Sequence, residues 1–166
     1  MAILSTERLV IEKVTLEDAP SLIKLMNDKD WIQNIGDRNI KTLEAAHEHI
    51  KERFFKSYEE SDFGFYAVRL KNDKTFIGVA GLIHREGLDH VDIGYGFLPE
   101  YRGMGYAFEA AKSIFEYGLN DLKIEKILAI VNPTNKASIH LLEKLGLHYE
   151  KMIRLPDEDK DIMLFS

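Results

Sequence analysis

Residues 91–107 read VDIGYGFLPEYRGMGYA, and this stretch decides the fold. Its first half is an apolar, glycine-containing strand that stops at Pro99, whose missing N–H and fixed φ suit a strand end. After Tyr106 the apolar residues recur at helical spacing, at positions 107, 110, 111, 114 and 115. Residues 102–106 are therefore predicted to form a tight turn that joins a strand directly to a helix.

This turn is a predicted anion site. The first N–H groups of a helix have no intrahelical acceptor, and the aligned peptide dipoles place positive charge there. Gly103 and Gly105 carry no Cβ, so a ligand can approach the backbone closely. A tight connection alone explains two glycines about equally well. The P-loop motif is absent, and G-x-G-x-x-G is not completed because Ala107 and Phe108 follow Tyr106, so a nucleotide-triphosphate hydrolase is not favoured.

Strands and helices alternate on either side of this turn. Strands are predicted over residues 9–14, 63–70, 76–84, 91–98, 124–131, 147–155 and 162–165. Helices are predicted to begin near residues 15, 42, 107 and 135, the second ending near residue 58. Gly146 lies where the last helix needs a left-handed C-cap. Since no linker, repeat or low-complexity tract interrupts residues 1–166, we expect a single α/β domain, a mixed sheet with helices packed on it.

The composition is that of a globular protein, with 45% hydrophobic and 30% charged residues. The net charge is −6 without a basic stripe, so no nucleic-acid partner is expected. A cationic acceptor is the more natural partner, although moderate acidity also serves solubility alone. Neither a signal peptide nor an apolar run of 18 residues is found, which predicts a cytoplasmic protein without a membrane partner. Cysteine is absent and the six histidines lack metal-ligand spacing, so neither an acyl-cysteine nor a metal site is expected.

Several segments, in matching order over nearly the whole chain, resemble the GNAT superfamily of N-acetyltransferases. Arg102-x-x-Gly105-x-Ala107 is similar to the Q/R-x-x-G-x-A/G signature of that family. Four further segments resemble one branch of the family in particular, the RimJ/RimL-like branch, which acetylates ribosomal-protein alanine. These segments are residues 5–9 (STERL), 92–95 (DIGY), 132–138 (NPTNKAS) and 141–147 (LLEKLGL). The resemblance implies the GNAT fold, an α/β (α+β) arrangement with a mixed, mostly antiparallel sheet of six to seven strands, splayed at strands four and five, and about four helices. It also implies acetyl-CoA as cosubstrate and a primary amine, of a protein N-terminus or a small molecule, as acceptor.

The resemblance further implies where CoA binds. In this family the pantetheine arm adds like a strand to the splayed edge, here along Phe97, Leu98 and Pro99. N–H donors are expected from Phe97 and Leu98 only, because proline has none. The pyrophosphate is expected on the amides of Arg102, Gly103, Met104, Gly105, Tyr106, Ala107 and Phe108. Asn135 matches an asparagine that meets the cofactor arm, although it can also serve simply as an N-cap.

The catalytic residues that the resemblance implies are Asp92 and Ser138. Asp92 aligns with a strand carboxylate that acts as general base, the alternative being a solvated residue on the outer face of a strand. Ser138 matches a serine near the thioester sulfur, and a small residue packed on the sheet is the alternative. Leu142 stands where many GNAT enzymes carry a tyrosine acid, so Ser138 or a bound water is the candidate replacement. Trp31 is predicted to contact the acceptor or to anchor the core.

A base is needed because an alkyl ammonium, with a pKa near 10, must lose its proton before attack. Glu109, His84 and His90 are weaker candidates than Asp92 for that role. The substitution at Leu142 also keeps open a non-catalytic acyl-CoA-binding or regulatory module, and a third alternative is an interaction domain without CoA. A homodimer is left open.

Overall fold

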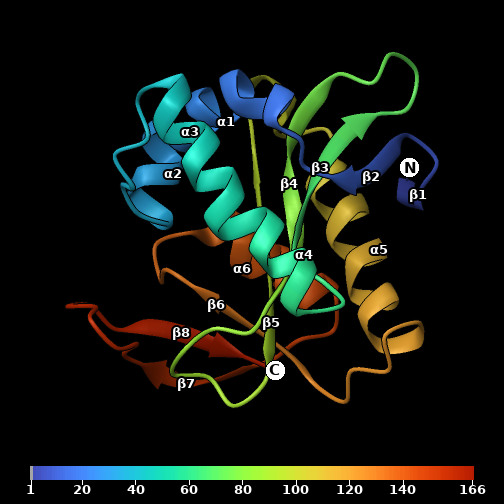
Figure 1. Ribbon diagram of the computed structural model, residues 1–166. Helices are drawn as coiled ribbons and strands as arrows, with labels where there is room; N and C mark the ends of the chain where they lie inside the picture. Colours follow the sequence, from blue (N-terminus) through green and yellow to red (C-terminus); the bar gives the residue numbers. More distant parts are fainter. Residues whose placement is uncertain (1) are drawn as a thin grey trace.

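The computed structural model describes residues 2–166, and its centre is one mixed sheet in the strand order β1-β2-β3-β4-β5-β6-β8-β7 (Figure 1). The strands are β1 (Ala2–Ser5), β2 (Leu9–Lys13), β3 (Phe65–Leu70), β4 (Phe76–Ile83), β5 (Val91–Phe97), β6 (Ile127–Val131), β7 (Tyr149–Ile153) and β8 (Ile162–Phe165). Neighbouring strands are antiparallel except β5 and β6, which are parallel. The predicted fold class is confirmed. The sheet has eight strands rather than six to seven, because the sequence pattern does not reveal the short edge strand β1.

Helices pack on both faces of this sheet. They are α1 (Ala19–Met26), α2 (Lys29–Asn34), α3 (Leu43–His49), α4 (Lys56–Glu60), α5 (Tyr106–Asn120) and α6 (Lys136–Lys144), with the 3-10 turns η1 (Leu16–Asp18) and η3 (Pro99–Tyr101) and the π-helical stretch η2 (Ile50–Phe55). In Figure 1 α3, η2 and α4 form one long helix, as the pattern over residues 42–58 predicts. One buried cluster joins the sheet to α5 and α6, and a second joins it to α1, α3 and η2.

Two of the predicted boundaries depend on how helices end. β6 begins at Ile127 rather than at residue 124, because the Ile124 N–H donates to the Gly118 carbonyl at 2.9 Å and still closes the end of α5. Lys123, with a φ of 57°, makes the bend that this closure needs. Gly146 follows α6 with a φ of 97°, which confirms the predicted left-handed C-cap.

The sheet splays open between β5 and β6. The two strands pair only at Val91 with Ile127 and at Asp92 with Leu128. Beyond that point β5 continues along β4, whereas β6 continues along β8. Residues 93–97 therefore present one edge that no strand covers.

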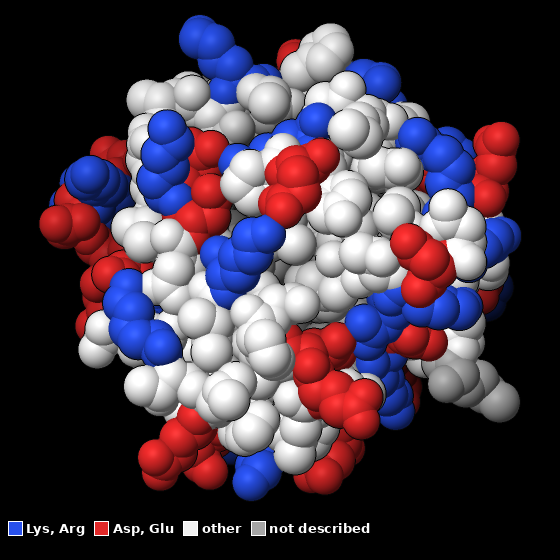
Figure 2. Space-filling view, turned by 90° about the horizontal axis from the view of Figure 1, so that it is seen from above, with Lys and Arg blue, Asp and Glu red and all other residues white. Residues whose placement is uncertain are grey.

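Charges of both signs are interspersed on the surface. Figure 2 shows acidic and basic side chains interspersed with uncharged residues on the face seen from above. Many of the ion pairs are exposed, such as Lys112 with Glu116 at 2.6 Å. Across residues 2–166, the helices are too short or too polar for any of them to traverse a lipid bilayer.

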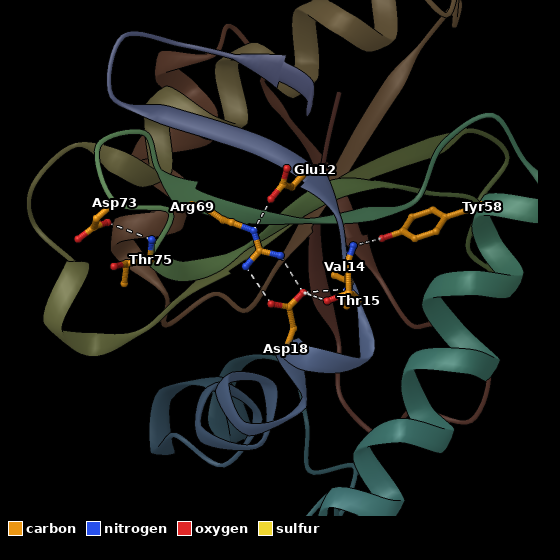
Figure 3. A network of polar contacts seen from close by, with 8 residues as sticks. All are labelled: Glu12, Val14, Thr15, Asp18, Tyr58, Arg69, Asp73 and Thr75. Carbon is orange, nitrogen blue, oxygen red and sulfur yellow. Dashed lines mark hydrogen bonds and ion pairs between the residues drawn. The ribbon is translucent and has the colours of Figure 1, made fainter. Parts of the chain in front are cut away.

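A buried polar network ties the first helical turn to the sheet (Figure 3). Both carboxylate oxygens of Asp18 accept hydrogen bonds from Arg69, at 2.8 and 2.9 Å. The same carboxylate accepts the Thr15 N–H at 2.9 Å, and Arg69 also donates to Glu12 at 2.6 Å. Because Asp18 is only 5% exposed, η1 and α1 are fixed to β3 through a desolvated charge pair.

Replacing Asp18 with alanine is expected to lower the free energy of unfolding by about 3 kcal/mol, because it leaves the Arg69 guanidinium buried with one partner fewer. Chemical denaturation followed by circular dichroism measures the change. Glu116→Ala, which removes an exposed pair, is the matched control and should shift the midpoint much less. Equal effects of the two substitutions would show that the buried pair contributes no more than a surface pair.

Candidate active site

A groove of about 1370 Å³ lies at the splay, with walls from α2, β5, the start of α5, β6 and α6. Most of the predicted site residues line it, namely Trp31, Asp92, Phe97, Arg102, Gly103, Gly105, Ala107, Phe108, Asn135 and Ser138. Leu98, Pro99, Met104 and Tyr106 do not belong to its lining. The groove thus brings together side chains that are up to 107 positions apart in the sequence, from Trp31 to Ser138.

The turn before α5 offers a row of free amides. Gly105 is the N-cap residue with a φ of 83°, and its carbonyl accepts the Glu109 N–H at 3.1 Å, which begins the helical ladder. Among the described residues, the N–H groups from Gly103 to Phe108 have no hydrogen-bond acceptor. Unpaired amides at a helix N-terminus suit an anion such as a pyrophosphate.

Arg102 has a structural role in this turn. Its N–H donates to the Pro99 carbonyl at 3.2 Å, so the predicted row of free amides begins one residue later than expected. The guanidinium donates to the Phe97 carbonyl at 3.0 Å and to Asp28 and Asp30 at 2.7 Å each. Arg102 therefore connects the turn to the N-terminus of α2.

Arg8 braces the same turn from the other side. Its guanidinium donates to the Met104 carbonyl at 2.9 Å and to Glu109 at 2.7 Å, and it lies 4.3 Å from the Tyr106 ring centre. Glu109 also accepts hydrogen bonds from the Thr6 hydroxyl and the Arg8 N–H. Partial burial raises the pKa of Glu109, but these hydrogen bonds outweigh it and the net pKa is lowered. Glu109 thus holds the turn against Thr6 and Arg8 of the STERL segment.

The open edge of β5 presents alternate backbone groups. The Leu98 N–H donates to the Ile77 carbonyl at 2.9 Å and so points toward β4. Leu98 cannot offer this N–H to a ligand, contrary to the prediction. The backbone N–H groups of successive strand residues point to opposite edges of the strand. The N–H groups of Phe97 and Tyr95 therefore point to the open edge of β5.

Asp92 lies at the point where β5 and β6 separate. Its side chain is completely buried, which excludes the alternative of a solvated outer-face residue. Burial raises the pKa of Asp92 to about 6, even though Arg85, at 3.3 and 3.4 Å, favours the charged form. At neutral pH this group is therefore a carboxylate that accepts a proton more readily than an ordinary aspartate. His84 lines the same groove, whereas His90 does not.

A hydrogen bond crosses the splay between the Tyr95 hydroxyl and Ser138 Oγ. Burial raises the pKa of Tyr95, and the bond to Ser138 opposes this shift. Leu142 is only 2% exposed, packs in the core and lines the groove with an aliphatic side chain that cannot donate a proton. Asn135 caps α6 by accepting the Ser138 N–H at 3.2 Å. Sequence reasoning missed Tyr95, although its hydroxyl and the Asp92 carboxylate are the two polar side-chain groups of β5.

Trp31 covers the backbone of β5. Its indole lies so close to Gly96 that a Cβ built there would be 2.3 Å from a ring carbon. The indole Nε1 and the Oδ1 of Asn34, one turn later on α2, are both buried without a hydrogen-bond partner in the described part of the chain. Both residues line the groove, so the wall formed by α2 holds one unsatisfied donor and one unsatisfied acceptor.

No group of three or more His, Asp or Glu side chains within residues 2–166 is arranged to hold a metal ion. The groups that converge on the groove are instead free amides, a buried carboxylate and a hydroxyl pair. Together they can bind an anion, accept a proton and donate a proton.

Comparison with known proteins agrees with this geometry. The family model described as "Acetyltransferase (GNAT) domain" matches residues 8–148. The uncharacterized protein YkkB of Bacillus subtilis is 32% identical over 91% of this chain and 88% of its own length. The spermidine N(1)-acetyltransferase of Escherichia coli is 37% identical over 43% of this chain and 40% of its own length. One solved structure that is similar is that of RimL, a ribosomal L7/L12 alpha-N-protein acetyltransferase in complex with coenzyme A. It superposes on this chain with a TM-score of 0.82 and covers 99% of this chain and 96% of that chain. At 16% sequence identity, this similarity shows a shared fold. Because the family model spans most of the chain, this protein belongs to the GNAT acetyltransferase family.

Proposed function

We propose that this protein transfers an acetyl group from acetyl-CoA to a primary amine, of a protein N-terminus or a small molecule, by direct attack in a ternary complex. The observation that carries the proposal is the groove at the splay, where the free amides before α5 and the buried Asp92 line one space. Acetyl-CoA, when bound, supplies the acetyl thioester. All other steps belong to residues of this chain.

The groove has the parts that CoA requires. The amides from Gly103 to Phe108 are free to hold the pyrophosphate, and the Phe97 N–H faces the open edge where a pantetheine arm would add like a strand. The Oδ1 of Asn135 is engaged in capping α6, which leaves its side-chain N–H groups to donate to an amide carbonyl of that arm.

Asp92 is the proposed general base. The α-amine of a peptide has a pKa near 8, so a carboxylate with a pKa of about 6 can accept its proton with a small energetic deficit. An ordinary aspartate, with a pKa near 3.9, would be a much weaker base. Burial thus gives Asp92 the basicity that the reaction needs.

Ser138 and Tyr95 are proposed to deliver a proton to the departing thiolate. A thiol has a pKa near 8.5, so the thiolate leaves even with weak assistance, and a hydroxyl within reach speeds that step. Ser138 donates to the sulfur, and Tyr95, already hydrogen-bonded to Ser138, replaces the proton. This pair would take the role that the buried Leu142 cannot perform.

Tyr95→Phe is expected to lower kcat about 10-fold to 100-fold with little change in the affinity for acetyl-CoA. Ser138→Ala should do the same, and the double variant should be no slower than the slower single variant, because the two hydroxyls act as a unit. Thiol release at saturating acetyl-CoA measures kcat. Tyr117→Phe, outside the groove, is the control. Wild-type kcat in both single variants would remove the pair from the mechanism.

The alternative is a non-catalytic acyl-CoA-binding or regulatory module, favoured by the leucine at position 142. Thermal unfolding with and without acetyl-CoA, followed by thiol release over a panel of peptides and amines, separates the two. A rise in Tm together with turnover supports the transferase, whereas a rise in Tm with no turnover favours the module. An unchanged Tm would contradict both.

A further inference from the structure

Three arginines converge on the acceptor side of the groove. Arg38 comes from the connection between α2 and α3, Arg53 from η2, and Arg85 from the segment after β4, and all three line the groove together with Asp92. Arg85 pairs with Asp92, but Arg38 and Arg53 have no carboxylate within 4.0 Å in the described part of the chain. Arg38 and Arg53 are thus exposed guanidinium groups that line the groove without a carboxylate partner.

These cations act on one another and on their neighbours. Burial lowers the pKa of Arg38, and so do Arg53 and Arg85, whereas Glu158 opposes the shift. Burial, Arg38 and Arg53 also lower the pKa of His49, which lines the same wall. Arg38, Arg53 and Arg85 therefore lie close enough to affect one another electrostatically, although the chain as a whole is acidic.

Several carboxylates in the groove lining are already neutralised. Asp30 pairs with Arg102, Glu60 with Lys56 and Asp161 with Arg154. The remaining carboxylates besides Asp92 are Glu52, Glu158 and Asp159, which are exposed, as Arg38 and Arg53 also are, and Glu158 is close enough to raise the pKa of Arg38. None of them lies within 4.0 Å of Arg38 or Arg53 in residues 2–166.

The wall formed by α2 adds an independent indication that a molecule binds here. The buried Nε1–H of Trp31 needs an acceptor, and the buried Oδ1 of Asn34 needs a donor. Leaving a buried polar group without a hydrogen bond is unfavourable, so a ligand that supplies both partners gains affinity on this wall. Trp31, Asn34 and the arginines line the same groove.

We propose that the acceptor is an amine whose own molecule carries an anionic group, a carboxylate or a phosphate, which binds Arg38 and Arg53 while the amine lies beside Asp92. This inference rests on the proposed acetyl transfer and specifies its substrate class. Neighbouring guanidinium groups also disfavour the ammonium form of the amine and so promote the neutral nucleophile. The same charges repel a polyamine, which carries several ammonium groups.

Matched acceptors test the proposal. Phosphoethanolamine is compared with ethanolamine, and the amidated peptide Ser-Asp-Gly with Ser-Asn-Gly, so that each pair differs in one anionic group; spermidine is the cationic probe. At least 10-fold higher kcat/KM is expected for the anionic member of one pair, mainly through KM, and the preference should shrink in high salt. If the phosphoethanolamine pair shows this preference, the acceptor is a small molecule. If the peptide pair shows it, the acceptor is a peptide N-terminus.

Arg38→Gln and Arg53→Gln should each reduce that preference about 10-fold while keeping the rise in Tm with acetyl-CoA. Lys51→Gln, which removes an exposed cation two positions before Arg53 and outside the groove lining, should retain the preference. Equal or faster turnover of spermidine or of the neutral acceptors overturns the inference and leaves the transferase intact. Absence of turnover with every acceptor contradicts the transferase and this inference with it.

Discussion

Asp92→Asn is expected to lower kcat about 100-fold to 1000-fold and, at the same time, to make the protein more stable at pH 7. The loss of rate follows because asparagine cannot accept the proton of the attacking ammonium. In the wild type, kcat/KM should fall as the pH drops below about 6, where Asp92 becomes protonated. That acidic limb should disappear in the variant. Thiol release measured between pH 5 and pH 9 gives both profiles.

The gain in stability follows from the raised pKa. An unfolded aspartate has a pKa near 3.9, whereas folded Asp92 has one of about 6, so the folded state holds this proton more tightly. The stability that this group contributes is present below pH 4 and is lost as the pH rises through 6. At pH 7 the charged form costs on the order of 3 kcal/mol, which asparagine avoids.

Thermal unfolding at pH 4 and at pH 7 tests the predicted gain in stability of Asp92→Asn. The Tm of Asp92→Asn should exceed that of the wild type at pH 7 and approach it at pH 4. Asp89→Asn, on the exposed loop before β5, is the control and should change neither activity nor Tm. A variant that is less stable at pH 7 and fully active would identify Asp92 as a structural partner of Arg85 alone.

Gly105→Val is expected to weaken acetyl-CoA binding more than 100-fold. The residue has a φ of 83°, a region that β-branched side chains rarely adopt, and the added carbons would occupy the space that an anion needs beside the free amides. A Cβ there would also stand 3.2 Å from the guanidinium of Arg8, which braces the turn. Isothermal titration calorimetry measures the affinity.

Gly146→Val separates binding from backbone strain. Gly146 also has a positive φ, of 97°, a Cβ there meets nothing within 4 Å, and the residue does not line the groove. Both substitutions should therefore destabilise the fold to a similar extent, whereas only Gly105→Val should lose acetyl-CoA. If Gly105→Val bound acetyl-CoA as tightly as Gly146→Val, the turn would not be the pyrophosphate site.

Sequence reasoning predicts features that depend on neighbouring residues. The strand, the turn and the helix from residue 91 onward follow from periodicity and from Pro99 and the glycines, and the structure has each of them. The helix α2 was missed because its six residues are too few to show a period, and its start depends on the cap that Asp28 provides. Boundaries moved where a helix end, such as that at Ile124, delayed the next strand.

Features that depend on partners far away in the sequence could not be predicted. The N–H of Leu98 is used by Ile77, and the alternation of strand residues does not tell which edge a neighbour occupies. The burial of Asp92 is set by the elements that cover β5, not by β5 itself. Net charge favoured a cationic acceptor, yet Arg38, Arg53 and Arg85, which come from three separate segments of the sequence, line the groove together.

The splay also decides which backbone edges are exposed to other protein molecules. An uncovered strand can pair with another chain and start aggregation. Residues 93–97 of β5 have such an edge, but it lies inside a groove walled by α2 and α6, where a slender ligand fits and a second sheet does not. The outer edges are protected differently, since β1 and β7 are short, each carries an irregularity in register, and β7 adds the charges of Glu150 and Lys151. The edge of β5 that is left open for chemistry is therefore one that self-association cannot reach.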